Sequence, residues 1–194
     1  MPNKPQATLV FSWGNPSRGD DAIGPRIYDM LRARDLAGVD LLTDFQLQIE
    51  HTVDLHHRER ILFVDASVSA QAPYELCRLY PDKDSSYTTH AMSPSALLAV
   101  YWKVNKRSPP ASFLLKVRGY EFGLGLPLSE NALGNVAKAC DFILELVATD
   151  DTRSWSARCA PAQGGARSAA ARGGELFLRS SSRCDRVCEP SVAL

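Results

Sequence analysis

The chain has 194 residues, which is enough for one domain with a sizeable hydrophobic core. Apolar residues make up 45% and charged residues 23%, as in ordinary soluble globular proteins, and equal numbers of acidic and basic side chains give a formal net charge of zero. This balance excludes a basic face for nucleic acid or membranes, and no segment approaches the roughly 20 apolar residues of a membrane helix.

The start of the chain and its cysteines indicate the cellular compartment. The first residues, MPNKPQATLVFSW, contain one lysine and only a short apolar run, so they lack the features of a secretory signal. The five cysteines are odd in number and scattered, which argues against a disulfide framework. We expect a cytoplasmic protein whose thiols are mostly reduced.

Strands alternate with helices in the first part of the chain. Residues 7–13 are predicted to form a buried strand, and residues 22–34 carry apolar side chains at helical spacing. A second strand is expected at residues 39–45, and a short helix or turn at residues 50–57. Residues 60–67 have an unbroken apolar centre, which is typical of a strand covered on both faces in a parallel sheet.

The same alternation continues to about residue 150. Residues 74–81 predict an edge strand, residues 94–104 a helix and residues 112–120 another strand. Residues 129–147 predict a long amphipathic helix with Ser129 as its N-cap. The pattern predicts an α/β fold, a three-layer sandwich with a twisted, mainly parallel sheet between helices. In such sheets, functional sites lie at the carboxyl ends of the strands.

The composition changes near residue 150. Residues 151–194 are rich in Arg, Ser, Ala and Gly and carry few large apolar side chains. Such a segment buries little, so we expect residues 1–150 to form the domain and residues 151–194 a disordered tail. Deletion of the residues after about Asp151 is therefore expected to leave activity intact.

The loop WGNPSRGDDAIG, residues 13–24, places two carboxylates at the start of the first helix. It lacks both the G-x-G-x-x-G order and the P-loop lysine, and its aspartates would repel a phosphate. The helix dipole favours carboxylates at this position whatever they do. Asp20 and Asp21 are thus either a capping residue beside a solvated one or part of a metal site.

Two further residues fall where a parallel sheet gathers functional groups. Asp65 lies at the end of the most apolar strand, where a buried charge needs a partner or a metal. His90 follows a polar loop and precedes a helix. Together with Asp21, these residues supply two carboxylates and an imidazole, a set that suits nickel or zinc. The other histidines, His51, His56 and His57, are interpreted as part of a solvated face.

No motif of a serine hydrolase elbow or a zincin helix is present. The runs GNPSRGDDAIG, ILFVDAS, TTHAMSP and FGLGLPLSE, in this order, instead resemble the hydrogenase maturation endopeptidases. The resemblance covers about residues 7–147. It implies an α/β enzyme that removes the C-terminal extension of the NiFe hydrogenase large-subunit precursor after nickel insertion. It also implies that Asp21, Asp65 and His90 contact the nickel, which the precursor supplies.

The chain departs from the family pattern in two loops. Ser12-Trp13-Gly14-Asn15 replaces a frequent Gly-x-Gly-Asn, and Asp44-Phe45-Gln46-Leu47 replaces a frequent Asp-Gly-Gly-Thr beside the site. The overall wording is most similar to the proteases that serve soluble, NAD-reducing hydrogenases. We expect a monomer whose partner is the large-subunit precursor, with no nucleic acid or membrane partner.

The residues leave the chemistry open in two respects. A nickel ion near the scissile peptide could polarise its carbonyl or lower the pKa of a water molecule, or else Asp21 or Asp65 could act as general base. The alternative functions are a chaperone that senses nickel without cutting the precursor, and an unrelated small α/β hydrolase.

Overall fold

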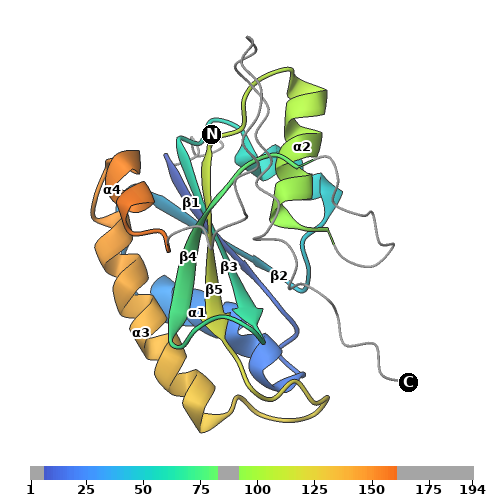
Figure 1. Ribbon diagram of the computed structural model, residues 1–194, viewed down its shortest axis with the longest axis vertical. Helices are drawn as coiled ribbons and strands as arrows, with labels where there is room; N and C mark the ends of the chain where they lie inside the picture. The colour runs from blue at the N-terminus through green and yellow to red at the C-terminus, as the bar shows by residue number, and fades with distance from the viewer. Residues whose placement is uncertain (1–6, 83–91, 161–194) are drawn as a thin grey trace, which may run out of the picture.

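The computed structural model describes residues 7–82 and 92–160 of the chain. Five strands form one sheet in the order β2-β1-β3-β5-β4 (Figure 1). The first three neighbouring pairs are parallel, and β4 joins β5 antiparallel at the edge, as predicted for an edge strand. The strands are β1 (Thr8–Trp13), β2 (Val39–Asp44), β3 (Arg60–Ser67), β4 (Tyr74–Leu79) and β5 (Ala111–Arg118).

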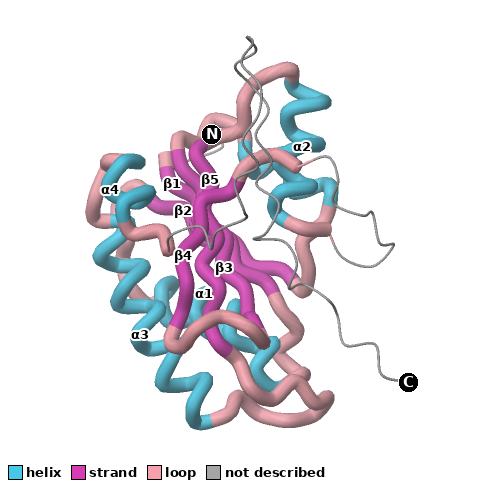
Figure 2. The backbone as a smooth tube through the Cα atoms, viewed as in Figure 1, coloured by secondary structure: helices cyan, strands magenta, loops and turns pink. Residues whose placement is uncertain are grey.

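Helices cover both faces of the sheet, and the strands form a twisted central layer (Figure 2). Helices α1 and α3 pack together on one face, whereas α2 packs with a short 3₁₀ helix, η2, on the other. The predicted three-layer α/β fold is confirmed. The helical elements are η1 (Gly19–Ala22), α1 (Ile23–Arg32), η2 (Ile49–Leu55), α2 (Pro94–Asn105), α3 (Glu130–Val147) and α4 (Thr152–Ala157).

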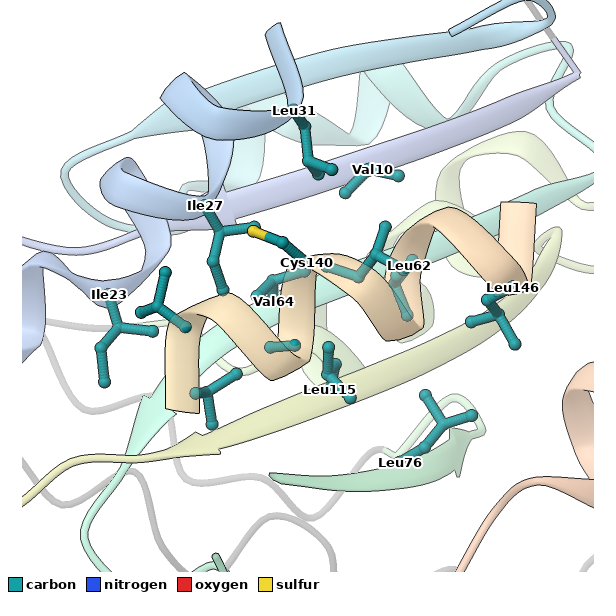
Figure 3. Close-up of a cluster of buried hydrophobic side chains, with 14 of the residues drawn as sticks. Val10, Ile23, Ile27, Leu31, Leu62, Val64, Leu76, Leu115, Cys140 and Leu146 are labelled. Carbon is teal, nitrogen blue, oxygen red and sulfur yellow. The ribbon is translucent and has the colours of Figure 1, made fainter. Parts of the chain in front are cut away.

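Alternate residues of each central strand pack into separate cores, because successive side chains of a strand point to opposite faces. The core below α1 and α3 is the larger one, and Figure 3 shows Ile27 of α1 and Cys140 of α3 lying over it. Its strand residues are Val10, Leu62, Val64, Phe113 and Leu115. The opposite core, under α2 and η2, takes Leu9, Phe11, Ile61, Phe63 and Leu114.

Helix α3 begins where the sequence predicts. The Ser129 hydroxyl accepts a hydrogen bond from the backbone N–H of Ala132 at 3.2 Å, which satisfies one of the otherwise unpaired donors of the first turn. Glu130 in that turn adds a favourable charge at the positive end of the helix dipole. The start of α3 is therefore well defined, and it lies beside the site described below.

The folded domain extends beyond the expected boundary at residue 150. Helix α4 lies in the segment predicted to be disordered, and its Trp155 is 0% exposed. The Trp155 ring centroid lies 5.2 Å from that of Phe113, and its indole N–H donates to the Thr149 carbonyl at 3.2 Å. The Arg60 guanidinium lies over the same ring, 5.7 Å from its centroid. The ordered domain thus includes residues 151–160, and residues 161–194 lie outside the described residues.

Among the described residues, no helix combines the length and the apolar character needed to cross a membrane. Cys77, Cys140 and Cys159, the cysteines within the described ranges, are free thiols, as the scattered cysteine pattern predicts.

Candidate active site at the carboxyl edge of the sheet

The four parallel strands end at the same edge of the sheet, and two predicted site residues lie there. Asp21 belongs to η1, in the connection between β1 and α1, and Asp65 belongs to β3, the neighbour of β1. The last paired positions of these two strands are Ser12 and Val64, so Asp65 lies just past the paired region. Since η1 also packs against β3, the fold brings both carboxylates to adjacent strand ends.

The turn after β1 folds back tightly on itself. Gly14 has a φ of +145°, and a Cβ atom there would lie 2.0 Å from the Asp21 carbonyl oxygen, so only glycine fits. The next residue, Asn15, donates its backbone N–H to Asp21 Oδ2 at 2.9 Å. Its own side-chain oxygen accepts from the Ser17 N–H at 2.9 Å, which closes an Asx turn. The glycine and Asn15 together hold Asp21 at the edge of the sheet.

The electrostatic surroundings of Asp21 suit a base. Burial raises the pKa of its carboxyl above the usual value, and the opposing effects of the Asn15 N–H and the Arg18 guanidinium do not cancel this rise. The side chain is only partly exposed. A carboxylate with a raised pKa holds a proton more readily near neutral pH, which is a property of general bases.

Asp20 has a different environment from its neighbour. It is fully buried, and its carboxylate accepts four hydrogen bonds: from the backbone N–H groups of Tyr120, Glu121 and Ser129 at 2.7, 3.0 and 2.7 Å, and from the Ser129 hydroxyl at 2.8 Å. The sequence interpretation placed Asp20 at the start of the helix that follows it. The structure corrects this, because Asp20 instead contacts the amino terminus of α3.

These hydrogen bonds make the stability of the protein depend on pH. Burial alone raises the pKa of Asp20, but the bonds from Ser129, Tyr120 and Glu121 outweigh it, so the pKa lies below its ordinary value of 3.8. A lowered folded pKa stabilises the fold above the unfolded pKa, and this stabilisation is lost as the pH falls through the folded pKa.

We therefore expect Asp20→Asn to lower the free energy of unfolding by about 2–3 kcal/mol near neutral pH. The difference from wild type should shrink below about pH 4, where the wild-type carboxyl also becomes protonated. Urea unfolding followed by circular dichroism at a series of pH values measures it, with Asp29→Asn, an exposed carboxyl on α1, as the control. A difference that does not vary with pH would contradict this assignment.

Asp65 is nearly buried, with 8% of its surface exposed. It shares its side of β3 with Ile61 and Phe63, so its side chain belongs to the face covered by α2 and η2. The Ser67 hydroxyl accepts the N–H groups of Ser69 and Ala70, which turns the chain away after the strand. An ionisable side chain at the end of an apolar strand is costly unless it serves a site, and its position agrees with the predicted role.

His90 lies outside the described residues, so the structure does not place it. Within residues 7–82 and 92–160, no group of three or more His, Cys, Asp and Glu side chains is arranged to hold a metal ion. The structure thus brings together two of the three predicted residues. Their contact with a metal stays a prediction.

The sequence interpretation missed a second acid–imidazole pair at this edge. His51 Nε2 lies 3.2 Å from Asp44 Oδ2 at the end of β2, and His51 Nδ1 accepts the Gln48 N–H at 2.9 Å. The neutral imidazole therefore carries its proton on Nε2 and donates to Asp44. The ring also packs edge-on against Phe11, with 4.7 Å between centroids. His51 is part of the packed site wall and does not belong to a solvated face.

No protein-family model and no curated protein matches the chain. Three solved structures share its fold. They are the NiFe hydrogenase maturation protease HycI from Thermococcus kodakarensis KOD1, with 17% identity over 74% of this chain and 94% of that chain and a TM-score of 0.60; the hydrogenase maturating endopeptidase HybD from E. coli, with 22% identity over 73% and 91% and a TM-score of 0.61; and a hydrogenase 2 maturation peptidase from a Thaumarchaeota archaeon, with 25% identity over 74% and 99% and a TM-score of 0.55.

The shared fold supports the resemblance that the motifs predicted. The similarity spans most of this chain and nearly the whole of each solved structure. Nothing in it distinguishes the predicted subtype.

Proposed function

We propose that this protein is a hydrogenase maturation endopeptidase that removes the C-terminal extension of a NiFe hydrogenase large-subunit precursor after nickel insertion. The observation that carries the proposal is the placement of Asp21 and Asp65 at adjacent strand ends, in a fold shared with solved hydrogenase maturation peptidases. The predicted motifs and the shared fold are independent of each other, because the motifs were identified from residues alone.

Nickel belongs to the substrate in this proposal, since the precursor carries it to the protease. Asp21, Asp65 and His90 contact it. Carboxylate and imidazole ligands suit a borderline divalent ion such as nickel, and Asp21 is partly exposed at the edge of the sheet. An ion next to the scissile peptide would supply Lewis-acid polarisation of the carbonyl.

The reaction is hydrolysis of one peptide bond. Water adds to the carbonyl carbon, the carbon–nitrogen bond breaks, and the leaving amine takes a proton. Asp21, with its raised pKa, is suited to accept the proton of the attacking water and return it to the amine. Asp65 at the adjacent strand end is the other candidate for this role.

Exposed apolar side chains beside the site support a protein substrate. Phe45, which directly follows β2, is 64% exposed, and Leu124, in the connection after β5, is 80% exposed. Both strands end at the site edge, one on each side of β1 and β3. Large apolar groups that remain in water at a site are typical of surfaces that contact another protein.

The mass of the large subunit tests the proposal directly. Incubation of the nickel-loaded precursor with the protease should release the extension and lower the mass of the subunit by the mass of the released peptide. The precursor without nickel should stay uncut. Binding of the precursor without any change of mass would favour a nickel-sensing chaperone, and neither binding nor cleavage would favour an unrelated hydrolase.

We further propose that the partner is a soluble, NAD-reducing hydrogenase and that processing occurs in the cytoplasm. The motif wording and the unusual loop Asp44-Phe45-Gln46-Leu47 motivate this choice. Competition between precursors of soluble and membrane-bound hydrogenases, at equal concentration, separates the possibilities. Equal rates of cleavage of both precursors would contradict the subtype.

A further inference from the structure

Asp20 and Asp21 are neighbours in the chain, yet their carboxylates have opposite surroundings. Asp20 is 0% exposed, whereas Asp21 is partly exposed at the site edge. We infer that Asp20 is a positioning residue, which sets the direction of the Asp21 carboxylate by holding η1 against the loop of residues 119–129. Asp20 itself does not contact the substrate, and the catalytic consequence rests on the proposed function.

The two segments are joined through main-chain bonds as well as through the Asp20 side chain. The Asp20 N–H donates to the Glu121 carbonyl at 2.6 Å, and the Gly19 N–H donates to the Leu126 carbonyl at 3.0 Å. Gly19 has a φ of +55°, and a Cβ atom there would lie 2.3 Å from the Glu121 oxygen. The backbones thus touch with no side chain between them, so a shift of the loop also shifts η1.

Helical geometry explains how one aspartate orients the other. A 3₁₀ turn has about three residues per turn, so consecutive side chains point about 120° apart. Once the Asp20 carboxylate is fixed toward Ser129 and the 119–129 loop, the next side chain must point away from that loop. Asp21 then meets the Asn15 N–H at 2.9 Å. The four bonds on Asp20 therefore determine where the partly exposed carboxylate lies.

The Asn15 amide signal in a ¹⁵N NMR spectrum tests the inference without any substrate, because this N–H is bonded to Asp21. Asp20→Asn places an NH₂ group among N–H donors and should break part of the network. The Asn15 signal should then move at least half as far as it does in Asp21→Asn. An unchanged Asn15 signal in a folded Asp20→Asn protein would overturn the inference.

Kinetics on the precursor give a second, separate readout. Asp20→Asn should lower kcat by about 10- to 100-fold and leave KM within about twofold, because a misplaced catalytic group slows the chemistry more than it weakens binding. The control is Ile143→Val, a buried change on α3, with Ile143→Ala as the larger step if a greater stability loss must be matched. An equal fall of kcat in the control of matched stability would overturn the positioning role.

Two substitutions at Ser129 keep the test decisive if Asp20→Asn does not fold. Ser129→Ala removes one of the four bonds and should move the Asn15 signal and kcat in the same direction, by less. Ser129→Thr retains the hydroxyl and should restore both. Failure of Ser129→Ala to change either would overturn the inference. If the wild-type protein does not cleave the precursor, the proposed function fails, while the Asn15 signal still decides the positioning role.

Discussion

Replacement of Asp65 or Asp21 by asparagine is expected to lower the rate of precursor processing by about 10²–10⁴-fold, the usual contribution of a general base. Asparagine preserves the size of each side chain but cannot accept a proton at neutral pH. Both residues lie at the ends of adjacent strands, where a substrate peptide crossing the sheet edge meets both. Timed mass measurements of the large subunit give the rate, and His90→Ala should block processing as well.

Asp29→Asn is the matched control for these variants. Asp29 is an exposed carboxyl on α1, the helix that follows Asp21, so its substitution removes the same charge from the same part of the chain. It should process the precursor at the wild-type rate. Full processing by either site variant would exclude that residue from the chemistry, provided that circular dichroism shows an intact fold.

The second large effect concerns stability. Trp155→Ala should lower the free energy of unfolding by about 3–5 kcal/mol, because it opens a cavity in the main core and removes the ring that lies under Arg60. The thermal midpoint should fall by roughly 6–20 °C. Scanning calorimetry of the full chain measures both quantities. Trp102→Ala, which removes a 44% exposed tryptophan from α2, should change the midpoint far less.

Two truncations test the same point at the level of the segment. A chain ending at residue 160 keeps α4 and the bond from the Ala160 N–H to the Leu76 carbonyl at 2.9 Å. A chain ending at residue 150 loses Trp155 and should be destabilised to a similar degree as Trp155→Ala. This replaces the expectation that everything after Asp151 is dispensable. Equal midpoints for the two truncated chains would contradict the role assigned to α4.

Local patterns were sufficient to predict the central sheet. The apolar run from Ile61 to Val64 indicated a strand buried on both faces, and in the structure its residues alternate between the two cores. The Ser129 cap was also readable, because a short polar side chain before an amphipathic run satisfies a free N–H of the first turn. In both cases the signal lies within a few neighbouring residues.

The features that were missed depend on contacts between distant segments. Trp155 stands alone among small and polar residues, so neither composition nor periodicity indicated that it fills a gap beside Phe113. Asp20 and His51 were assigned to solvent or to a local cap, yet their partners lie in other segments or become visible only once the loop is folded. An Asp at the end of a predicted strand with a His seven residues later was the available signal for the Asp44–His51 pair.

The long reach of Asp20 has a consequence for biosynthesis. The bond from the Ser129 N–H to Asp20 joins residues that are 109 positions apart, and the bonds to Tyr120 and Glu121 span 100 and 101 positions. A nascent chain that has reached only β3 contains both Asp21 and Asp65 but lacks every partner of Asp20. Such long-range contacts form late in folding. The protease therefore acquires an ordered site only after the start of α3 has left the ribosome, which protects other nascent chains from a half-made enzyme.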